Sequence, residues 1–181
     1  MQRKTLAIGV LGAIACVQIG LAAYSDPSVL TIEDVKGTPA SQHKVDQLRS
    51  DYENVEIRTR TPWTKEGEQI VFRGPRILDV LARHDLDAHS SVQFIAYDNF
   101  TSEITLDEIR TFDPIFAIDR ACTDADRRTG RCSRDQTFTP LAAEEQGPIF
   151  LAWPYEELPT AYVPARNSIW VWFVVAVRPV Q

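Results

Sequence analysis

The sequence predicts an α+β fold, mixed and rich in β-structure, with a few short helices. Many apolar stretches of four to eight residues stand between turn-forming residues, which is the pattern of strands. Only a few short stretches have apolar residues at helical spacing. The chain has 181 residues, and neither a shift in composition nor an internal repeat divides it. We therefore expect one domain over residues 23–181.

Strands and helices alternate in the first half of the predicted domain. In residues 54–61, Val55 and Ile57 point to one side and Glu56 and Arg58 to the other, as in a half-buried strand that Pro62 stops. In residues 45–52 and 77–85 the apolar side chains share one face, as in a helix. Strands are expected at 29–32, 54–61, 68–75 and 91–98, and helices at 45–52 and 77–85.

The second half of the domain is predicted to be mostly strand and loop. Thr105 and Glu108 form a capping-box pattern that begins one or two helical turns. In residues 167–177 both alternate sets of side chains are apolar, so either both faces of this strand are covered or one face is a partner surface, and we favour core. Strands are expected at 101–104, 113–119, 147–154 and 167–177, and a loop at 121–145.

Residues 1–22 have the form of a secretory signal peptide. Basic Arg3 and Lys4 precede an apolar run of small residues, and Ala22 suits the cleavage position. An uncleaved N-terminal anchor is the alternative, because the apolar run is nearly long enough to span a bilayer. A lipoprotein signal at Cys16 is disfavoured, because Ala13 stands where leucine is usual. We expect a periplasmic or secreted protein, and its net charge of −6 disfavours nucleic acid as a partner.

Cys122 and Cys132 remain in the exported chain, within a polar segment. An oxidising compartment favours a disulfide between them, and free thiols are the alternative. A redox CxxC pair is excluded by their spacing, and no histidine lies near them to complete a zinc site. We therefore expect a structural bridge.

No motif for catalysis or metal binding stands out. The chain has three histidines, His43, His84 and His89, without HExxH spacing, and a metal site in the HDLDAH stretch is disfavoured. Asp124 and Asp126 begin like a calcium loop that lacks its later ligands, so a solvated hairpin is the preferred interpretation. The chain contains no GxSxG, GxGxxG or phosphate-loop motif. The residues alone predict no catalytic group and no metal ligand.

Several segments, taken in order, resemble a known family. VLTI, TRTPWT, FRGPRILDVL, IAYDNF, DPIFAIDR, GPIFLAWP and SIWVWFVVAV are similar to segments of small exported proteins in the oxidoreductase molybdopterin-binding domain family. The resemblance covers residues 28–180 and implies the fold of the sulfite oxidase catalytic domain. The Cys122–Cys132 loop departs from the family pattern. The matching residues are Thr59, Thr61, Pro62, Trp63 and Thr64; Phe72, Gly74 and Pro75; Ala96, Asp98, Asn99 and Phe100; Gly147, Pro148, Phe150, Trp153 and Pro154; and Trp170 and Trp172.

The same resemblance bears on the cofactor. In the enzymes of this family a cysteine thiolate binds molybdenum beside the pterin, in the region where this chain has Thr59, Arg60 and Thr61. A threonine hydroxyl is a poor ligand for a metal that is otherwise held by sulfur. We therefore expect no cofactor, and molybdopterin bound at a cysteine-free site is the alternative.

Three functions follow from these observations. The first is a non-catalytic exported protein that binds a small ligand or a partner protein in the cleft where the related enzymes hold their cofactor, or on the surface around it. If its arginines share a pocket, the ligand is an anion, since guanidinium groups suit carboxylate or phosphate. The alternative to an arginine pocket is that Arg58 and Arg60 face solvent and pair with nearby glutamates, while Trp63 is part of the core. The second is a molybdopterin-dependent oxidoreductase, and the third a structural subunit that docks on a membrane-bound partner through residues 155–164 or 167–177. The candidate ligand-binding residues are Arg58, Arg60, Thr61, Trp63, Arg73, Asp98 and Phe100.

Overall fold

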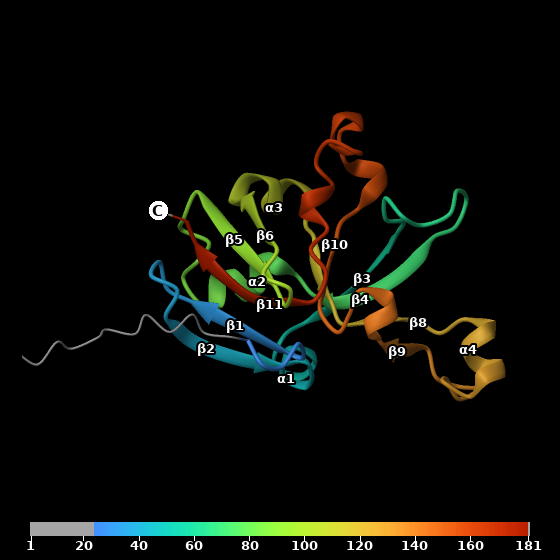
Figure 1. The fold of residues 1–181 in the computed structure, drawn as a ribbon. Coiled ribbons are helices and arrows are strands. Elements are labelled where there is room, and N and C mark those ends of the chain that lie inside the picture. Colours follow the sequence, from blue (N-terminus) through green and yellow to red (C-terminus); the bar gives the residue numbers. More distant parts are fainter. Residues whose placement is uncertain (1–23, 181) are drawn as a thin grey trace, which may run out of the picture.

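A five-stranded sheet forms one side of the molecule in the computed structural model, which describes residues 24–180 (Figure 1). The strands β1 and β11 run parallel, and every other neighbouring pair in this sheet is antiparallel. The strand order is β2 (Pro39–Lys44), β1 (Val29–Glu33), β11 (Val174–Pro179), β5 (Ser91–Ala96) and β6 (Thr101–Thr105).

Two further sheets lie beside the first. An antiparallel four-stranded sheet has the order β3 (Asn54–Thr59), β4 (Ile70–Pro75), β8 (Asp119–Ala121) and β9 (Phe138–Pro140). A two-stranded antiparallel sheet pairs β7 (Ile115–Ala117) with β10 (Phe150–Ala152). The predicted class, a mixed and β-rich α+β fold, is confirmed.

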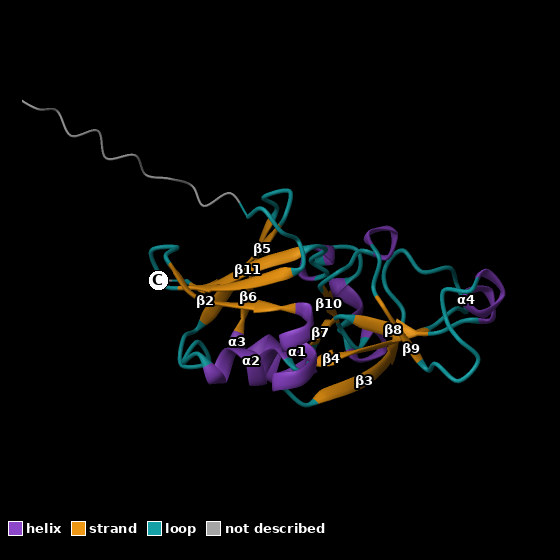
Figure 2. Cartoon of the chain, turned by 90° about the horizontal axis from the view of Figure 1, so that it is seen from below, coloured by secondary structure: helices purple, strands orange, loops and turns teal. Residues whose placement is uncertain are grey.

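Four α-helices accompany the sheets over the described residues. Figure 2 shows α1, α2 and α3 together along one side of the five-stranded sheet, and α4 at the far end of the molecule. The predicted capping box is present, because the hydroxyl of Thr105 accepts a hydrogen bond from the Glu108 amide. The helices are α1 (Val45–Asp51), α2 (Ile77–Arg83), α3 (Leu106–Phe112) and α4 (Asp124–Thr129), and the 3-10 turns are η1 (Ala143–Glu145), η2 (Tyr155–Glu157), η3 (Thr160–Tyr162) and η4 (Asn167–Ile169).

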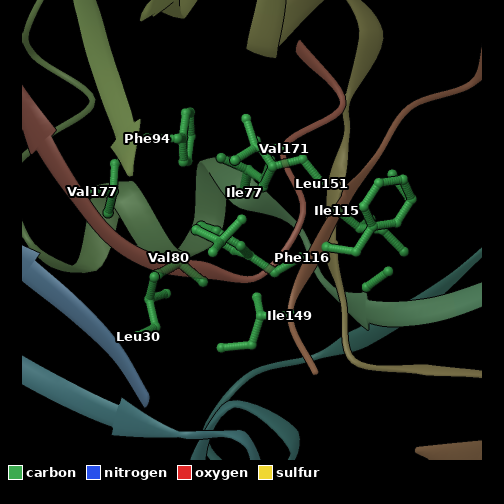
Figure 3. Packing of buried hydrophobic residues seen from close by; sticks show 14 of the residues in the cluster. Leu30, Ile77, Val80, Phe94, Ile115, Phe116, Ile149, Leu151, Val171 and Val177 are labelled. Atoms are coloured by element: carbon green, nitrogen blue, oxygen red, sulfur yellow. The ribbon is translucent and has the colours of Figure 1, made fainter. Parts of the chain in front are cut away.

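The apolar faces of these elements meet in one hydrophobic cluster. Leu30, Val177 and Phe94 project from the five-stranded sheet toward Ile77 and Val80 of α2 (Figure 3). The cluster continues through the two-stranded sheet, where the rings of Phe94 and Phe116 lie 5.9 Å apart in an edge-to-face arrangement. Apolar burial of this kind is the main favourable term in folding.

The strand β2 has no counterpart in the sequence prediction. Its sequence, PASQHK, lacks alternating apolar residues, and its side chains are exposed or half-buried. It pairs with β1 alone at the edge of the sheet, so hydrogen bonds of the backbone define it. An edge strand of this kind leaves no hydrophobic periodicity to detect.

The last predicted strand, over 167–177, is wrong in its first half. Residues Asn167–Ile169 form the turn η4, and Phe173 has a left-handed backbone with φ of 51°. A strand cannot pass through that conformation, so β11 begins only at Val174. The expectation that this segment is mainly core is confirmed, since Ile169–Val171 and Val174–Val177 are buried, whereas Trp172 is exposed.

Two other predicted segments also differ. The strand expected at 113–119 is divided at Ile118, because β7 pairs with β10 whereas β8 pairs with β4 and β9. The loop expected at 121–145 contains β9 and α4, so the solvated hairpin predicted at Asp124 and Asp126 is instead a helix that Thr123 caps.

The predicted disulfide between Cys122 and Cys132 is present, with 6.2 Å between the two Cα atoms. This bridge is consistent with an exported protein, because disulfides persist in oxidising compartments. The predicted signal peptide, residues 1–22, lies outside the described residues. Within residues 24–180, no helix has both the length and the apolar character needed to cross a bilayer.

Candidate functional site

Trp63 stands between two pockets that adjoin on one face of the protein. The smaller one, of about 360 Å³, is the aromatic pocket. Its size falls within the usual range for small-molecule sites. The aromatic pocket is lined by Trp63, Ala96, Asp98, Phe100, Asn167, Ser168, Trp170, Trp172 and Phe173.

Three aromatic side chains of this pocket are open to solvent. Trp63 is 48% exposed, Phe100 45% and Trp172 36%. The rings of Trp63 and Trp172 contact each other edge to face, with 4.8 Å between their centroids. Large aromatic groups gathered at a surface are typical of sites that bind ligands or partners, because leaving them in water is unfavourable.

The turn between β5 and β6 holds Asp98 and Phe100 at the rim of the aromatic pocket. The Asp98 carboxylate accepts a hydrogen bond from the Phe100 amide at 3.0 Å, and Asn99 adopts a left-handed backbone, with φ of 67°. The amide of Tyr97 donates to the carbonyl of Phe173 at 2.9 Å. The turn is therefore fixed to the segment that carries Trp172.

Two buried polar atoms belong to residues of the aromatic pocket and have no hydrogen-bond partner among residues 24–180. They are Asn167 Oδ1 and Trp170 Nε1. Leaving one such group buried without a partner costs about 1–3 kcal/mol. Both atoms are closed off from solvent, so they belong to the wall of the pocket and are not groups that a ligand contacts directly.

The larger pocket, of about 670 Å³, lies on the other side of Trp63 and is named the polar pocket here. Arg58 and Lys65 line it and form no ion pair within residues 24–180. Arg120 also lines it, but Asp126 and Glu145 hold its guanidinium group, and these hydrogen bonds raise the pKa of Arg120. The remaining lining residues are Thr61, Thr64, Glu68, Gln69, Ile70, Val71, Phe72, Ala121, Cys122, Thr123, Leu141, Glu144, Glu145 and Gln146.

The three arginines predicted to share a pocket are not brought together. Arg60 pairs with Glu156 at 2.8 Å and lies over the ring of Tyr155. Arg73 pairs with Asp119 at 2.7 Å, because β4 and β8 place these two residues side by side. Neither arginine lines the aromatic or the polar pocket.

The other candidates from the sequence divide between the two pockets. Arg58 and Thr61 line the polar pocket, Asp98 and Phe100 line the aromatic pocket, and Trp63 lines both. Trp63 is therefore surface and not core. The prediction missed Asn167, Trp170, Trp172 and Phe173 as pocket residues. The signals for the two tryptophans were the apolar alternation of residues 167–177, with its suggestion of a partner surface, and their place in the family resemblance.

Thr59 and Thr61, which stand where the resemblance leads us to expect a metal-binding cysteine, do not fit a metal site. The hydroxyl of Thr59 donates to the Trp153 carbonyl at 2.8 Å and accepts from the Tyr155 amide at 2.9 Å. Thr61 Oγ1 lies 3.0 Å from Thr64 Oγ1, and both Thr59 and Thr61 are buried. These hydroxyls support the backbone and are not free to bind molybdenum. Within residues 24–180 there is also no group of three or more His, Cys, Asp or Glu side chains suited to a metal.

Glu108 anchors the segment that leads into the wall of the aromatic pocket. Its carboxylate accepts two hydrogen bonds from Arg166, both at 2.6 Å, and one from the hydroxyl of Tyr162 at 3.0 Å. Burial alone would raise the pKa of Glu108, but the hydrogen bonds from Arg166, Thr105 and Tyr162 outweigh it and lower this pKa to about 2. The ionised carboxylate is therefore part of the native structure.

Glu108 is expected to make the protein sensitive to acid. Because its pKa is lowered on folding, its ionisation stabilises the protein above pH 4.5 and this contribution is lost as the pH falls toward 2. The shift corresponds to about 3 kcal/mol. We expect Glu108→Gln to lower the free energy of unfolding by about that amount at pH 7. Urea unfolding between pH 7 and pH 2 should show this deficit shrinking with acid, whereas the exposed control Glu157→Gln should show none. A deficit that is constant over this range would contradict the assignment.

Comparison of the chain with family models and with curated proteins found no match.

Proposed function

We propose that this chain is an exported, non-catalytic binding protein with the fold of the sulfite oxidase catalytic domain. Its ligand, a small molecule or a side chain of a partner protein, inserts an apolar or aromatic group into the aromatic pocket. One observation carries the proposal: the exposed rings of Trp63 and Trp172 meet edge to face and line the aromatic pocket.

The charges around the two pockets limit the chemistry of the ligand. Asp98 is the one charged side chain among the residues that line the aromatic pocket. The group bound there is therefore neutral or positively charged, since aromatic faces and a carboxylate both favour cations over anions. A negatively charged part of the same ligand would contact Arg58 and Lys65 in the polar pocket across Trp63.

The competing hypothesis is a molybdopterin-dependent oxidoreductase with a cysteine-free site. It requires a side chain that binds molybdenum in the segment of Thr59 and Thr61, whose hydroxyls already have hydrogen-bond partners inside the protein. Elemental analysis of protein exported by a host that makes the cofactor separates the two hypotheses. Stoichiometric molybdenum would overturn the proposed binding function, and its absence would remove the alternative.

Loss of either exposed tryptophan is expected to weaken ligand binding by about 30-fold or more. A buried tryptophan anchor contributes about 2 kcal/mol or more at a binding hot spot, which is roughly 30-fold in affinity. Aromatic, aliphatic and cationic small molecules would be screened by thermal shift, because any ligand that prefers the folded state raises the melting temperature. We expect compounds that stabilise the wild type to lose this effect in Trp63→Ala and Trp172→Ala.

Tyr97→Ala is the matched control for both substitutions. Tyr97 is an aromatic residue with 46% exposure on the same turn, yet it does not line the aromatic pocket. It should keep the stabilisation that the tryptophan variants lose. Compounds that stabilise all three variants as they do the wild type would rule out the aromatic pocket as their site.

A further inference from the structure

Two histidines from distant parts of the sequence meet beside the five-stranded sheet. His43 lies on β2, and His84 follows the last residue of α2. Their Nε2 atoms are 2.9 Å apart, and the two rings meet edge to face with 5.0 Å between centroids. This pair lies outside both pockets, and the inference that follows goes beyond the proposed binding function.

Oxygen atoms surround the two imidazole rings. The hydroxyl of Ser41 lies 3.4 Å from His43 Nε2 and 3.5 Å from His84 Nδ1, and that of Tyr52 lies 3.4 Å from His84 Nε2. Ser41 and His43 are two residues apart on β2, so their side chains leave the same face of the strand. Both histidines are half-buried, so one side of the pair is open to solvent.

The protonation state of the pair suits metal binding. Burial lowers the pKa of His43, and burial together with the neighbouring His43 lowers the pKa of His84. Imidazole binds a metal ion in its neutral form, and the direction of both shifts favours that form. Without a metal, the N–H of one ring donates to the other nitrogen across the same 2.9 Å.

We propose that His43 and His84 form a two-imidazole site for a copper(II) ion. The 2.9 Å between the two nitrogens is the length of the hydrogen bond that the metal would replace, so the rings must turn for both lone pairs to meet one ion. Imidazole nitrogens are ligands that suit copper(II).

Copper(II) also leads the usual order of affinity among divalent metals for nitrogen ligands. The other positions around it would be filled by water and by the hydroxyls of Ser41 and Tyr52. Arg83, whose guanidinium lies 4.0 Å from the centre of the Tyr52 ring, opposes a cation here, whereas the nearby Asp51 carboxylate favours one. The site is therefore expected to be of moderate affinity and reversible.

Titration of the purified protein with copper(II) tests the proposal, with glycine as a competing chelator and calorimetry and electron paramagnetic resonance as readouts. We expect one copper per chain, with a tetragonal spectrum whose splitting shows two nitrogen ligands. His43→Gln and His84→Gln should each weaken copper binding by about 100-fold or more, because even partners that only support a ligand are worth 10–100-fold. Zinc should bind more weakly than copper.

His89→Gln is the matched control, because His89 is the third histidine, is also half-buried and makes no contact with the pair. It should retain wild-type copper binding. Melting curves without metal would establish that each variant is folded, and histidine labelled with ¹⁵N would identify the ligands in the wild type without any substitution. No copper binding in competition with glycine, binding unchanged in both pair variants, or binding lost in His89→Gln would each overturn the site.

Discussion

Gly74→Ala is expected to prevent cooperative folding of this protein. Gly74 lies in β4, where the four-stranded sheet meets β7 of the two-stranded sheet. A Cβ atom there would lie closer than 3.0 Å to the backbone carbonyl of Phe116 and 3.3 Å from the Cα of Ala117. Both contacts are with backbone, so no side-chain rotation can relieve them. The two sheets would have to separate.

The expected cost of Gly74→Ala exceeds about 3 kcal/mol, the upper end of the usual overpacking range. Gly67→Ala is the control, because Gly67 has no neighbour within 4 Å and a left-handed backbone with φ of 80°. That variant should lose only about 1–2 kcal/mol, from backbone strain. Urea unfolding followed by circular dichroism measures both. A Gly74→Ala protein within 1 kcal/mol of the wild type would show that the sheets do not meet as described.

The sequence predicted the elements whose signals are local. The Thr105–Glu108 capping box and the apolar face of α2 depend on residues three or four apart, and both are present in the structure. The element β2 could not be predicted in this way, because only its pairing with β1 defines it. The same holds for the division of residues 113–119, where the neighbours of β7 and β8 come from far along the chain.

The candidate site was predictable to a similar extent. Trp63, Asp98 and Phe100 stand in short motifs, and all three line the aromatic pocket. Trp172 faces this pocket because the chain turns at Phe173, and a left-handed phenylalanine has no signal in the sequence. The pairing between Arg73 and Asp119 depends on the register of β4 and β8, which alternation within one strand does not reveal.

The His43–His84 pair shows the same limit for chemistry. Its two residues are separated by 41 positions, and one of them lies on the strand that the sequence did not predict. A search of the sequence for closely spaced histidines finds His84 with His89, but the partner of His84 in the structure is His43. Ligands from separate elements can be recognised only after the sheet is assembled.

Asp119→Ala is expected to cost about 3 kcal/mol, the lower end of the range for removing one partner of a buried ion pair. Asp119 is buried on β8 and accepts hydrogen bonds from Arg49 of α1 at 2.8 Å and Arg73 of β4 at 2.7 Å. The lower end applies because both arginines are about one-third exposed, so water would hydrate them in part. This carboxylate connects a helix beside the five-stranded sheet to two strands of the other sheet.

The cost of losing Asp119 should also depend on pH. Burial would raise the pKa of Asp119, but the hydrogen bonds from Arg49 and Arg73 outweigh it, so the pKa is lowered. The stabilisation is therefore present at neutral pH and is lost in acid, as the pH falls through the pKa of the folded state. Asp119→Asn, which keeps the shape of the side chain, should show a deficit in the free energy of unfolding that shrinks with acid.

Asp46→Ala separates the buried pair from the exposed one, because Asp46 binds the same Arg49 with its own side chain 93% exposed. It should change the free energy of unfolding little, since exposed ion pairs contribute little. Urea unfolding of the Asp119 and Asp46 variants in parallel, at neutral and acid pH, measures the difference. Equal effects at the two positions would mean that Arg49 and Arg73 do not depend on Asp119, and that the contact between helix and sheet is held by apolar packing alone.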